Sequence, residues 1–174
     1  MVRTSRWQVG AILLLGITAC GTTPDPFVLD ILGQVNAARA STRTCGSKSY
    51  PSVPALTWNS KLQAAARGHN QDMFENKFFS HTGSNGSSLG ERIKAQGYAY
   101  STAGENIAWG QPTTQSVMDA WLKSAGHCAN IMNANYTEIG VAVLYPSDKP
   151  KSPYWTMNLA KPSAAKASSE SVGQ

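Results

Sequence analysis

The residues with the greatest chemical capacity in this sequence are His81, Glu105 and His127. Imidazole and carboxylate groups can transfer protons, and two imidazoles with one carboxylate can also hold Zn²⁺ or another divalent cation with one position open for water. Water on such a metal could attack a carbonyl group. The three residues are far apart in the chain, so they form a site only if the fold brings three segments together. We predict that they face one cavity.

The segment around His127 predicts the start of a helix. Ser124 has the short oxygen side chain that caps helices, and Gly126 permits an unusual backbone angle just before the histidine. We therefore expect His127 at a turn-like or strand-like junction that opens a new helix. Cys128, the next residue, is either half of a disulfide or a nucleophile beside His127.

His81 and Glu105, the other two candidates, lie at positions where a functional site is expected. His81 follows Phe78 and Phe79, which are expected to be core anchors, and it opens a loop of glycines and small polar residues through Ser87. Loops on a rigid scaffold often carry functional residues. Glu105 precedes a strand-like apolar piece, so we expect a buried carboxylate there, for which two histidines would be suitable partners.

Hydrophobic periodicity predicts the elements that must position these residues. His69 lies on the apolar face of one predicted helix and is interpreted as a packed core residue. Trp121 is expected in the core as well. The predicted helices cover about 26–40, 59–76, 88–97 and a stretch after Pro112, and Ser88 with Glu91 forms a capping box at the start of the third. The predicted hairpin pairs residues 139–145 with residues 154–159. Residues 41–54 are expected to form a loop that only a disulfide would hold in place.

Residues 1–19 have the pattern of a signal peptide, with two arginines before an apolar run. That run, Val9 to Ile17, is too short for a bilayer, which needs about 20 residues. Its end resembles the lipobox of bacterial lipoproteins, which implies lipidation of Cys20. We therefore expect a tether over 20–26 and an exported protein anchored by lipid to the cell envelope. No Asp follows Cys20, so the outer membrane is the expected location if the cell has two membranes.

Assigning Cys20 to a lipid leaves Cys45 and Cys128 as a pair, and export favours a disulfide between them. A bridge that closes so long a loop would stabilise the fold by about 4 to 5 kcal/mol in the chain-entropy model. The alternative, Cys128 as a nucleophile, stays open at this point.

Composition narrows the class of protein. The chain has 174 residues, of which 41% are hydrophobic and 14% charged, which favours one compact domain. The formal net charge is +5, but the basic residues are scattered without a nucleic-acid motif, so we expect no nucleic-acid partner. Residues 161–174, rich in Ala, Ser and Lys, predict a disordered tail.

Four motifs, in this order, resemble the bacterial branch of the CAP superfamily, which groups cysteine-rich secretory proteins, antigen 5 and pathogenesis-related 1 proteins and is also called the SCP domain. The resemblance covers about 27–160. It implies an α+β fold, a three-layer α-β-α sandwich around a three- or four-stranded antiparallel sheet, with a central cleft. The motifs are Phe78-Phe79-Ser80-His81-Thr82-Gly83, Gly104-Glu105-Asn106-Ile107-Ala108, Trp121-Leu122-Lys123-Ser124-Ala125-Gly126-His127-Cys128-Ala129-Asn130-Ile131 and Ile139-Gly140-Val141.

The resemblance also assigns positions within that cleft. His81 matches the first histidine of the family, Glu105 the glutamate of its Gly-Glu-Asn motif, and His127 the second histidine. The second glutamate of the family corresponds to Ser124 here, which weakens any mechanism that requires four ligands or a second carboxylate.

Two classes of function remain open, and with them whether the protein is an enzyme. The resemblance favours an extracytoplasmic binding module that holds a lipid, another cell-envelope component or a divalent metal. The alternative is a metal-dependent hydrolase or protease that uses His81, Glu105 and His127. A purely structural role in the envelope is a third possibility.

Overall fold

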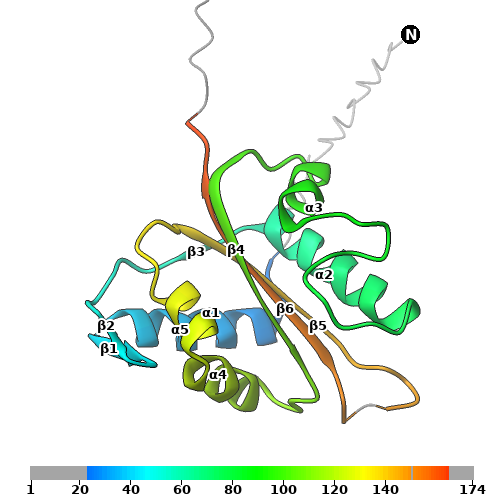
Figure 1. The fold of residues 1–174 in the computed structure, drawn as a ribbon, viewed down its shortest axis with the longest axis horizontal. Coiled ribbons are helices and arrows are strands. Elements are labelled where there is room, and N and C mark those ends of the chain that lie inside the picture. Colours follow the sequence, from blue (N-terminus) through cyan, green and yellow to red (C-terminus); the bar gives the residue numbers. More distant parts are fainter. Residues whose placement is uncertain (1–22, 150, 165–174) are drawn as a thin grey trace, which may run out of the picture.

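The structure is a computed structural model that describes residues 23–149 and 151–164. The predicted signal peptide, the predicted lipidation site Cys20 and most of the predicted tail lie outside these residues. The described residues form eleven elements (Figure 1): α1 (Pro26–Arg39), β1 (Arg43–Cys45), β2 (Lys48–Tyr50), β3 (Thr57–Trp58), α2 (Ser60–Glu75), α3 (Leu89–Ala95), β4 (Tyr100–Trp109), α4 (Thr114–Lys123), α5 (Ala125–Ile131), β5 (Glu138–Leu144) and β6 (Tyr154–Pro162).

The central sheet has four strands in the order β3-β5-β6-β4. β6 pairs antiparallel with both β5 and β4, so the predicted hairpin is confirmed. β3 adds two residues parallel to β5, so the sheet is mixed where an antiparallel one was expected. Because the order places β4 at one end, one side of β4 has no neighbouring strand among the described residues.

Helices cover both faces of this sheet, which confirms the α-β-α sandwich. On β6, Trp155, Met157 and Leu159 point into the core that α1 and α4 share. The residues between them point the other way, because side chains alternate along a strand. Thus Thr156 donates a hydrogen bond to Asn70 of α2, and Asn158 donates to the Leu62 carbonyl of the same helix.

The predicted helix starts are confirmed in most cases. Asn59 accepts hydrogen bonds from the first backbone N–H groups of α2, and Ser88 with Glu91 forms the capping box of α3. The junction before His127 differs from the prediction. Gly126 does not have a positive φ, Ser124 makes no capping hydrogen bond, and His127 lies inside the first turn of α5.

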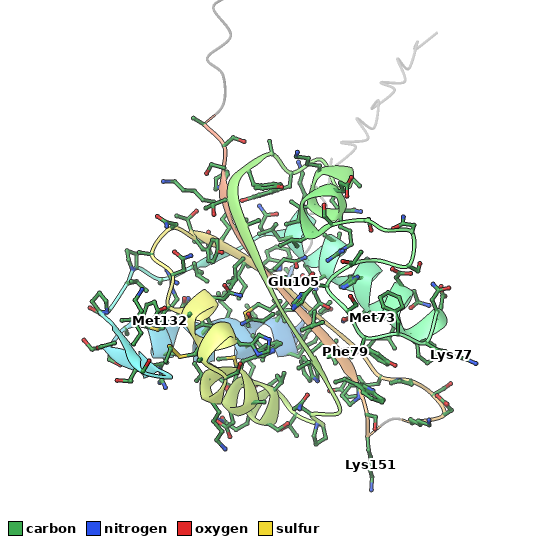
Figure 2. All side chains as sticks on the ribbon, in the orientation of Figure 1. Met73, Lys77, Phe79, Glu105, Met132 and Lys151 are labelled. Carbon is green, nitrogen blue, oxygen red and sulfur yellow. A yellow bond between two sulfur atoms is a disulfide. The ribbon has the colours of Figure 1, made fainter. Side chains whose placement is uncertain are left out.

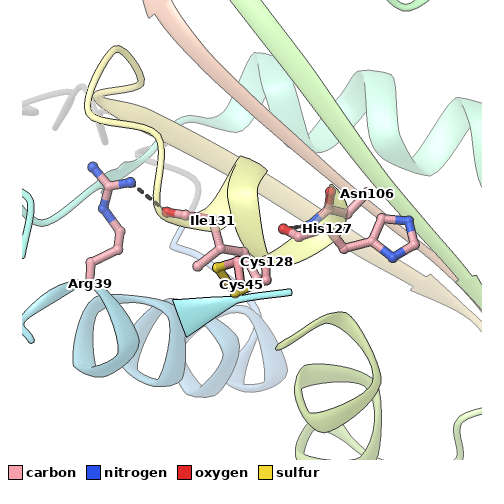
Figure 3. The surroundings of a disulfide bond; sticks show 6 residues. All are labelled: Arg39, Cys45, Asn106, His127, Cys128 and Ile131. Carbon is pink, nitrogen blue, oxygen red and sulfur yellow. Dashed lines mark hydrogen bonds between the residues drawn. A yellow bond between two sulfur atoms is a disulfide. The ribbon is translucent and has the colours of Figure 1, made fainter. Parts of the chain in front are cut away.

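The segment 41–54 is more regular than predicted, because β1 and β2 form a small hairpin there. Gly46 has φ +63° at its turn, a backbone conformation that glycine adopts without strain. The disulfide between Cys45 and Cys128 then joins this hairpin to α5 (Figure 3), as predicted. Both cysteines are buried, so the alternative of Cys128 as a free nucleophile does not hold.

Arg39 is a second anchor of this region that the sequence analysis did not identify. Its side chain is fully buried, and its guanidinium donates to the carbonyls of Pro54, Ile131, Asn133 and Tyr136. The bond to Ile131 is drawn in Figure 3. The end of α1 is thus tied to the segments on either side of it by a buried cation as well as by the disulfide.

Two further predictions need correction. Phe79, expected in the core, is 47% exposed. β6 continues through Lys161 and Pro162, residues that were assigned to the tail. Trp121 and His69 are buried as expected. Within the described residues, no helix is both long enough and apolar enough to cross a membrane.

Candidate functional site

The candidate site is built around Glu105, in the middle of the edge strand β4. Alternation along the strand sends the Glu105 side chain to the face covered by α2 and α3, while Asn106 points to the face covered by α5. Glu105 is only 7% exposed although it lies on an edge strand. A carboxylate buried to this extent needs hydrogen-bond partners.

Each oxygen of the Glu105 carboxylate has its own partner. His81 Nδ1 lies 2.8 Å from Oε1, and an Arg92 guanidinium nitrogen donates to Oε2, also at 2.8 Å. The predicted pairing of His81 with Glu105 is therefore present, together with a cation that was not predicted. The Glu105 side chain is 3% exposed and that of Arg92 is 10% exposed, whereas the His81 side chain is 57% exposed. Of these three side chains, only the His81 ring is largely accessible to solvent.

Arg92 also fixes the loop that carries His81. It lies on α3, and its second terminal nitrogen donates to the backbone carbonyls of His81 and Ser87, each at 2.9 Å. Since the capping box of Ser88 and Glu91 sets the start of α3, it also sets where Arg92 stands. One guanidinium thus holds both the carboxylate and the histidine loop.

His69 closes the site from α2. Its ring is fully buried, and Nε2 lies 2.9 Å from the Ser80 carbonyl and 4.0 Å from Glu105 Oε1. The carbonyl can only accept, so Nε2 donates and carries the proton. Burial lowers the pKa of His69, which favours this neutral form. His69 is therefore the packed core residue that was predicted, and its bond to the Ser80 carbonyl also holds the start of the His81 loop.

His127 lies on α5, which packs against β4 from the face of the sheet opposite to α2 and α3. Asn106 donates to the His127 carbonyl at 3.1 Å, drawn in Figure 3, and Asn130 donates to the Glu105 carbonyl and to Asn106 Oδ1. These bonds satisfy polar groups on the free edge of the strand. They also hold α5 against the strand that carries Glu105 (Figure 1).

The pKa values of His81 and His127 are shifted in opposite directions. The hydrogen bond to Glu105 raises the pKa of His81. Burial lowers the pKa of His127, and the charge on His81 lowers it further. The two rings are therefore close enough to interact electrostatically. The structure thus brings His81 into contact with Glu105 and places His127 near His81.

As the side chains stand, the Glu105 carboxylate is not free to bind a metal ion. One of its oxygens is engaged by His81 and the other by the cationic Arg92. No group of three His, Cys, Asp or Glu side chains in the described residues is placed to hold a metal. Metal ligands such as those of zinc must approach the ion to about 2.0–2.2 Å.

The sequence analysis gave no role in this site to Arg92, Asn106 or Asn130, although Asn106 and Asn130 lie within two of its motifs. Arg92 follows directly after the capping-box residue Glu91, which was a usable signal for a side chain near the His81 loop. Asn130 stands three positions after His127, and residues three apart share one side of a helix. Neither sequence pattern predicts which carboxylate or carbonyl group the side chain of Arg92 or Asn130 contacts.

Comparisons with known sequences and structures point to the same family as the sequence motifs. A family model described as the cysteine-rich secretory protein family matches residues 32–159. The uncharacterized protein YkwD of Bacillus subtilis is 45% identical over 98 residues, which are 56% of this chain and 38% of that relative. An extracellular protein containing an SCP domain from Bacillus anthracis has a similar structure, with a TM-score of 0.64 and 29% identity over 77% of this chain and 40% of that chain.

An outer surface protein of Borrelia burgdorferi shares the fold, with a TM-score of 0.59 and 22% identity over 64% of this chain and 80% of that chain. The present chain spans less than half the length of the two Bacillus proteins.

Proposed function

The chain belongs to the cysteine-rich secretory protein family, and we propose that it acts outside the cytoplasm as a binding module for a lipid or another cell-envelope component. The binding groups are the imidazoles of His81 and His127. The recognised group is an anionic oxygen, of the kind found in a lipid phosphate or in a carboxylate of the cell wall.

The observation that carries this proposal is the engagement of the Glu105 carboxylate. His81 Nδ1 and Arg92 occupy its two oxygens, so the carboxylate itself has little left to offer a ligand. His81 directs its other ring nitrogen, Nε2, away from Glu105. Because the pKa of His81 is raised, its ring stays charged, with a proton on Nε2 as well as on Nδ1, up to a higher pH than a free imidazole does. A charged N–H donor of this kind favours an anionic acceptor.

Export is part of the proposal. Two solved structures with this fold are described as an extracellular protein and an outer surface protein, and the first residues have the pattern of a lipoprotein signal. Lipid attachment at Cys20 is tested by metabolic labelling with a fatty acid. We expect label in the full chain and none in the Cys20→Ser variant, which should leave the membrane fraction.

Three soluble probes test the binding site: inorganic phosphate, glycerol 1-phosphate and dihexanoylphosphatidylglycerol. We expect each to shift the His81 and His127 imidazole resonances saturably at pH 6, and His81→Ala to weaken binding at least tenfold. A higher affinity for the lipid than for phosphate alone would assign a lipid ligand. Absence of any saturable shift, or equal binding by the His81→Ala variant, would contradict the proposal.

Metal-dependent hydrolysis is not favoured by this geometry. The predicted zinc site of His81, Glu105 and His127 is tested by titrating zinc into the protein and into its His81→Ala variant. We expect no one-to-one binding that the substitution abolishes, since Arg92 occupies the position next to Glu105. A tight site lost on substitution would instead favour the alternative, a metal-dependent hydrolase.

A further inference from the structure

Aromatic side chains gather at the end of the sheet beyond the Glu105 site. They line a hollow of about 620 Å³ between the end of α2, the segment after it, the end of β4 and the β5–β6 connection. We call this hollow the aromatic pocket. Figure 2 shows Phe79 at this end of the molecule, with Lys77 and Lys151 farther out. Its aromatic members are Phe74, Phe78, Phe79, Trp109 and Tyr154.

The rings of the aromatic pocket form a connected surface. Trp109 and Tyr154 are cross-strand neighbours whose rings stack at 5.8 Å with planes 23° apart. Phe79 continues the surface at 6.5 Å from Trp109. Since Trp109 is 51% exposed and Phe79 47% exposed, much of this surface faces solvent. Adjacent exposed rings of this size mark a binding surface more often than isolated exposed side chains do.

Trp109 differs from the other described tryptophans in its indole N–H. Trp58, Trp121 and Trp155 each donate this group to an acceptor within the protein. No described residue accepts a hydrogen bond from the indole of Trp109. Trp109 can therefore offer a flat ring face together with a hydrogen-bond donor.

The polar part of the lining carries both signs of charge. Glu75 and Asp148 supply two carboxylates, and Lys77 and Lys149 supply two ammonium groups. Neither sign is in excess, so the lining does not select a charged ligand. A purely apolar ligand, such as an alkyl chain, would cover these groups without offering them hydrogen bonds, which costs free energy.

We propose that the aromatic pocket binds an oligosaccharide of β-linked pyranose rings. Such rings with equatorial substituents have flat C–H faces that can pack on Trp109 and Phe79. Their hydroxyl groups lie around the rim of each ring, where carboxylates and ammonium groups can hydrogen-bond to them. This ligand combines an apolar face with uncharged polar edges, as the pocket does. The site is separate from the proposed oxyanion site at His81 and does not depend on it.

The test uses cellotetraose and chitotetraose, which are β-1,4-linked oligomers of glucose and N-acetylglucosamine. Titration followed by the indole N–H resonance of Trp109 should give saturable binding of at least one sugar. Trp109→Ala and Phe79→Ala should each weaken binding at least tenfold, as measured by saturation transfer to the sugar protons. Trp109→Phe, which keeps a ring face, should lose less than Trp109→Ala.

Two controls separate this site from the rest of the molecule. Leu29 on α1 is as exposed as Trp109, at 53%, so Leu29→Ala removes a similar exposed apolar group and should leave sugar binding unchanged. His81→Ala should also leave it unchanged, because the oxyanion site is separate. Phe79 lies outside the helices and strands, so its variant should remain folded, which a far-UV spectrum checks.

Three outcomes would overturn the proposal. The first is dissociation constants above 10 mM for both sugars; the second is equal affinity in the Trp109→Ala and Phe79→Ala variants. The third is binding of decanoate at Trp109 with no binding of either sugar, which would assign the pocket to an alkyl chain.

Discussion

Arg92 holds the buried carboxylate of Glu105 on the side opposite to His81, at 2.8 Å from Oε2. The same guanidinium binds the His81 carbonyl. Through this one side chain, helix α3 fixes both members of the His81–Glu105 pair, so the geometry of the exposed histidine depends on a residue that a ligand at His81 need not touch.

Arg92→Met should lower the free energy of unfolding by about 3 kcal/mol, because it leaves a buried carboxylate with a single partner. Urea denaturation measures this change. Arg67→Met is a matched control, since the Arg67–Asp25 pair has side chains that are 68% and 48% exposed. A pair as exposed as this contributes about 0–1 kcal/mol. Equal losses for the two variants would show that the Arg92–Glu105 pair is not buried in solution.

His81 and His127 should titrate in separate pH ranges, with His81 gaining its proton at the higher pH. The Glu105 hydrogen bond raises the pKa of His81, and burial and the His81 charge lower that of His127. In Glu105→Gln the pKa of His81 should fall, since its largest stabilising interaction is lost. The imidazole Cε1–H resonances report each ring. Identical titration curves in the wild-type protein would disprove the pairing.

The His81→Ala substitution should cost more stability at pH 5.5 than at pH 8.5. Because the folded-state pKa of His81 is raised, its contribution is present below the unfolded value of about 6.5 and is lost as the pH rises through the folded value. His69 has the opposite sign: its lowered pKa makes its contribution present above about 6.5 and lost on acidification. Urea denaturation at the two pH values measures the difference, and a cost independent of pH would contradict it.

Asn130→Ala should destabilise the protein by about 1–2 kcal/mol. It removes the donor that serves both the Glu105 carbonyl and Asn106 Oδ1 at the free edge of β4. The His127 resonances should shift as well, because α5 loses a contact with that strand. Asn135→Ala, at an exposed position in the following loop, is the control and should change neither quantity. Chemical denaturation and the His127 resonance give the two readouts.

A Cys20→Ser variant of the full chain should have no thiol that reacts with Ellman's reagent after unfolding. Cys45 and Cys128 are joined over a separation of 83 residues. Reduction should release two thiols and cost about 4–5 kcal/mol in the chain-entropy model. Two reactive thiols before reduction would mean that the bridge does not form in the protein.

The sequence alone determined most of the scaffold and the identity of the central pair. The helix starts at Asn59 and Ser88 are local, because a side chain caps backbone groups only a few residues away. The β5–β6 hairpin follows from strong β-forming residues around a turn. His81 and Glu105 could be identified because each lies in a short continuous motif of the sequence. The cysteine pair could be identified because only two cysteines remain once Cys20 is assigned to a lipid.

Only the tertiary structure decided which partners these residues have. Three contacts join residues that are 13 to 97 positions apart in the sequence. They are Arg92 with Glu105, Arg39 with four backbone carbonyls, and Asn130 with the edge of β4. No local pattern encodes such contacts, because they depend on how the helices pack on the sheet. The exposure of Phe79 has the same cause: whether an aromatic ring is buried depends on what the fold places over it, and here that space is the open aromatic pocket.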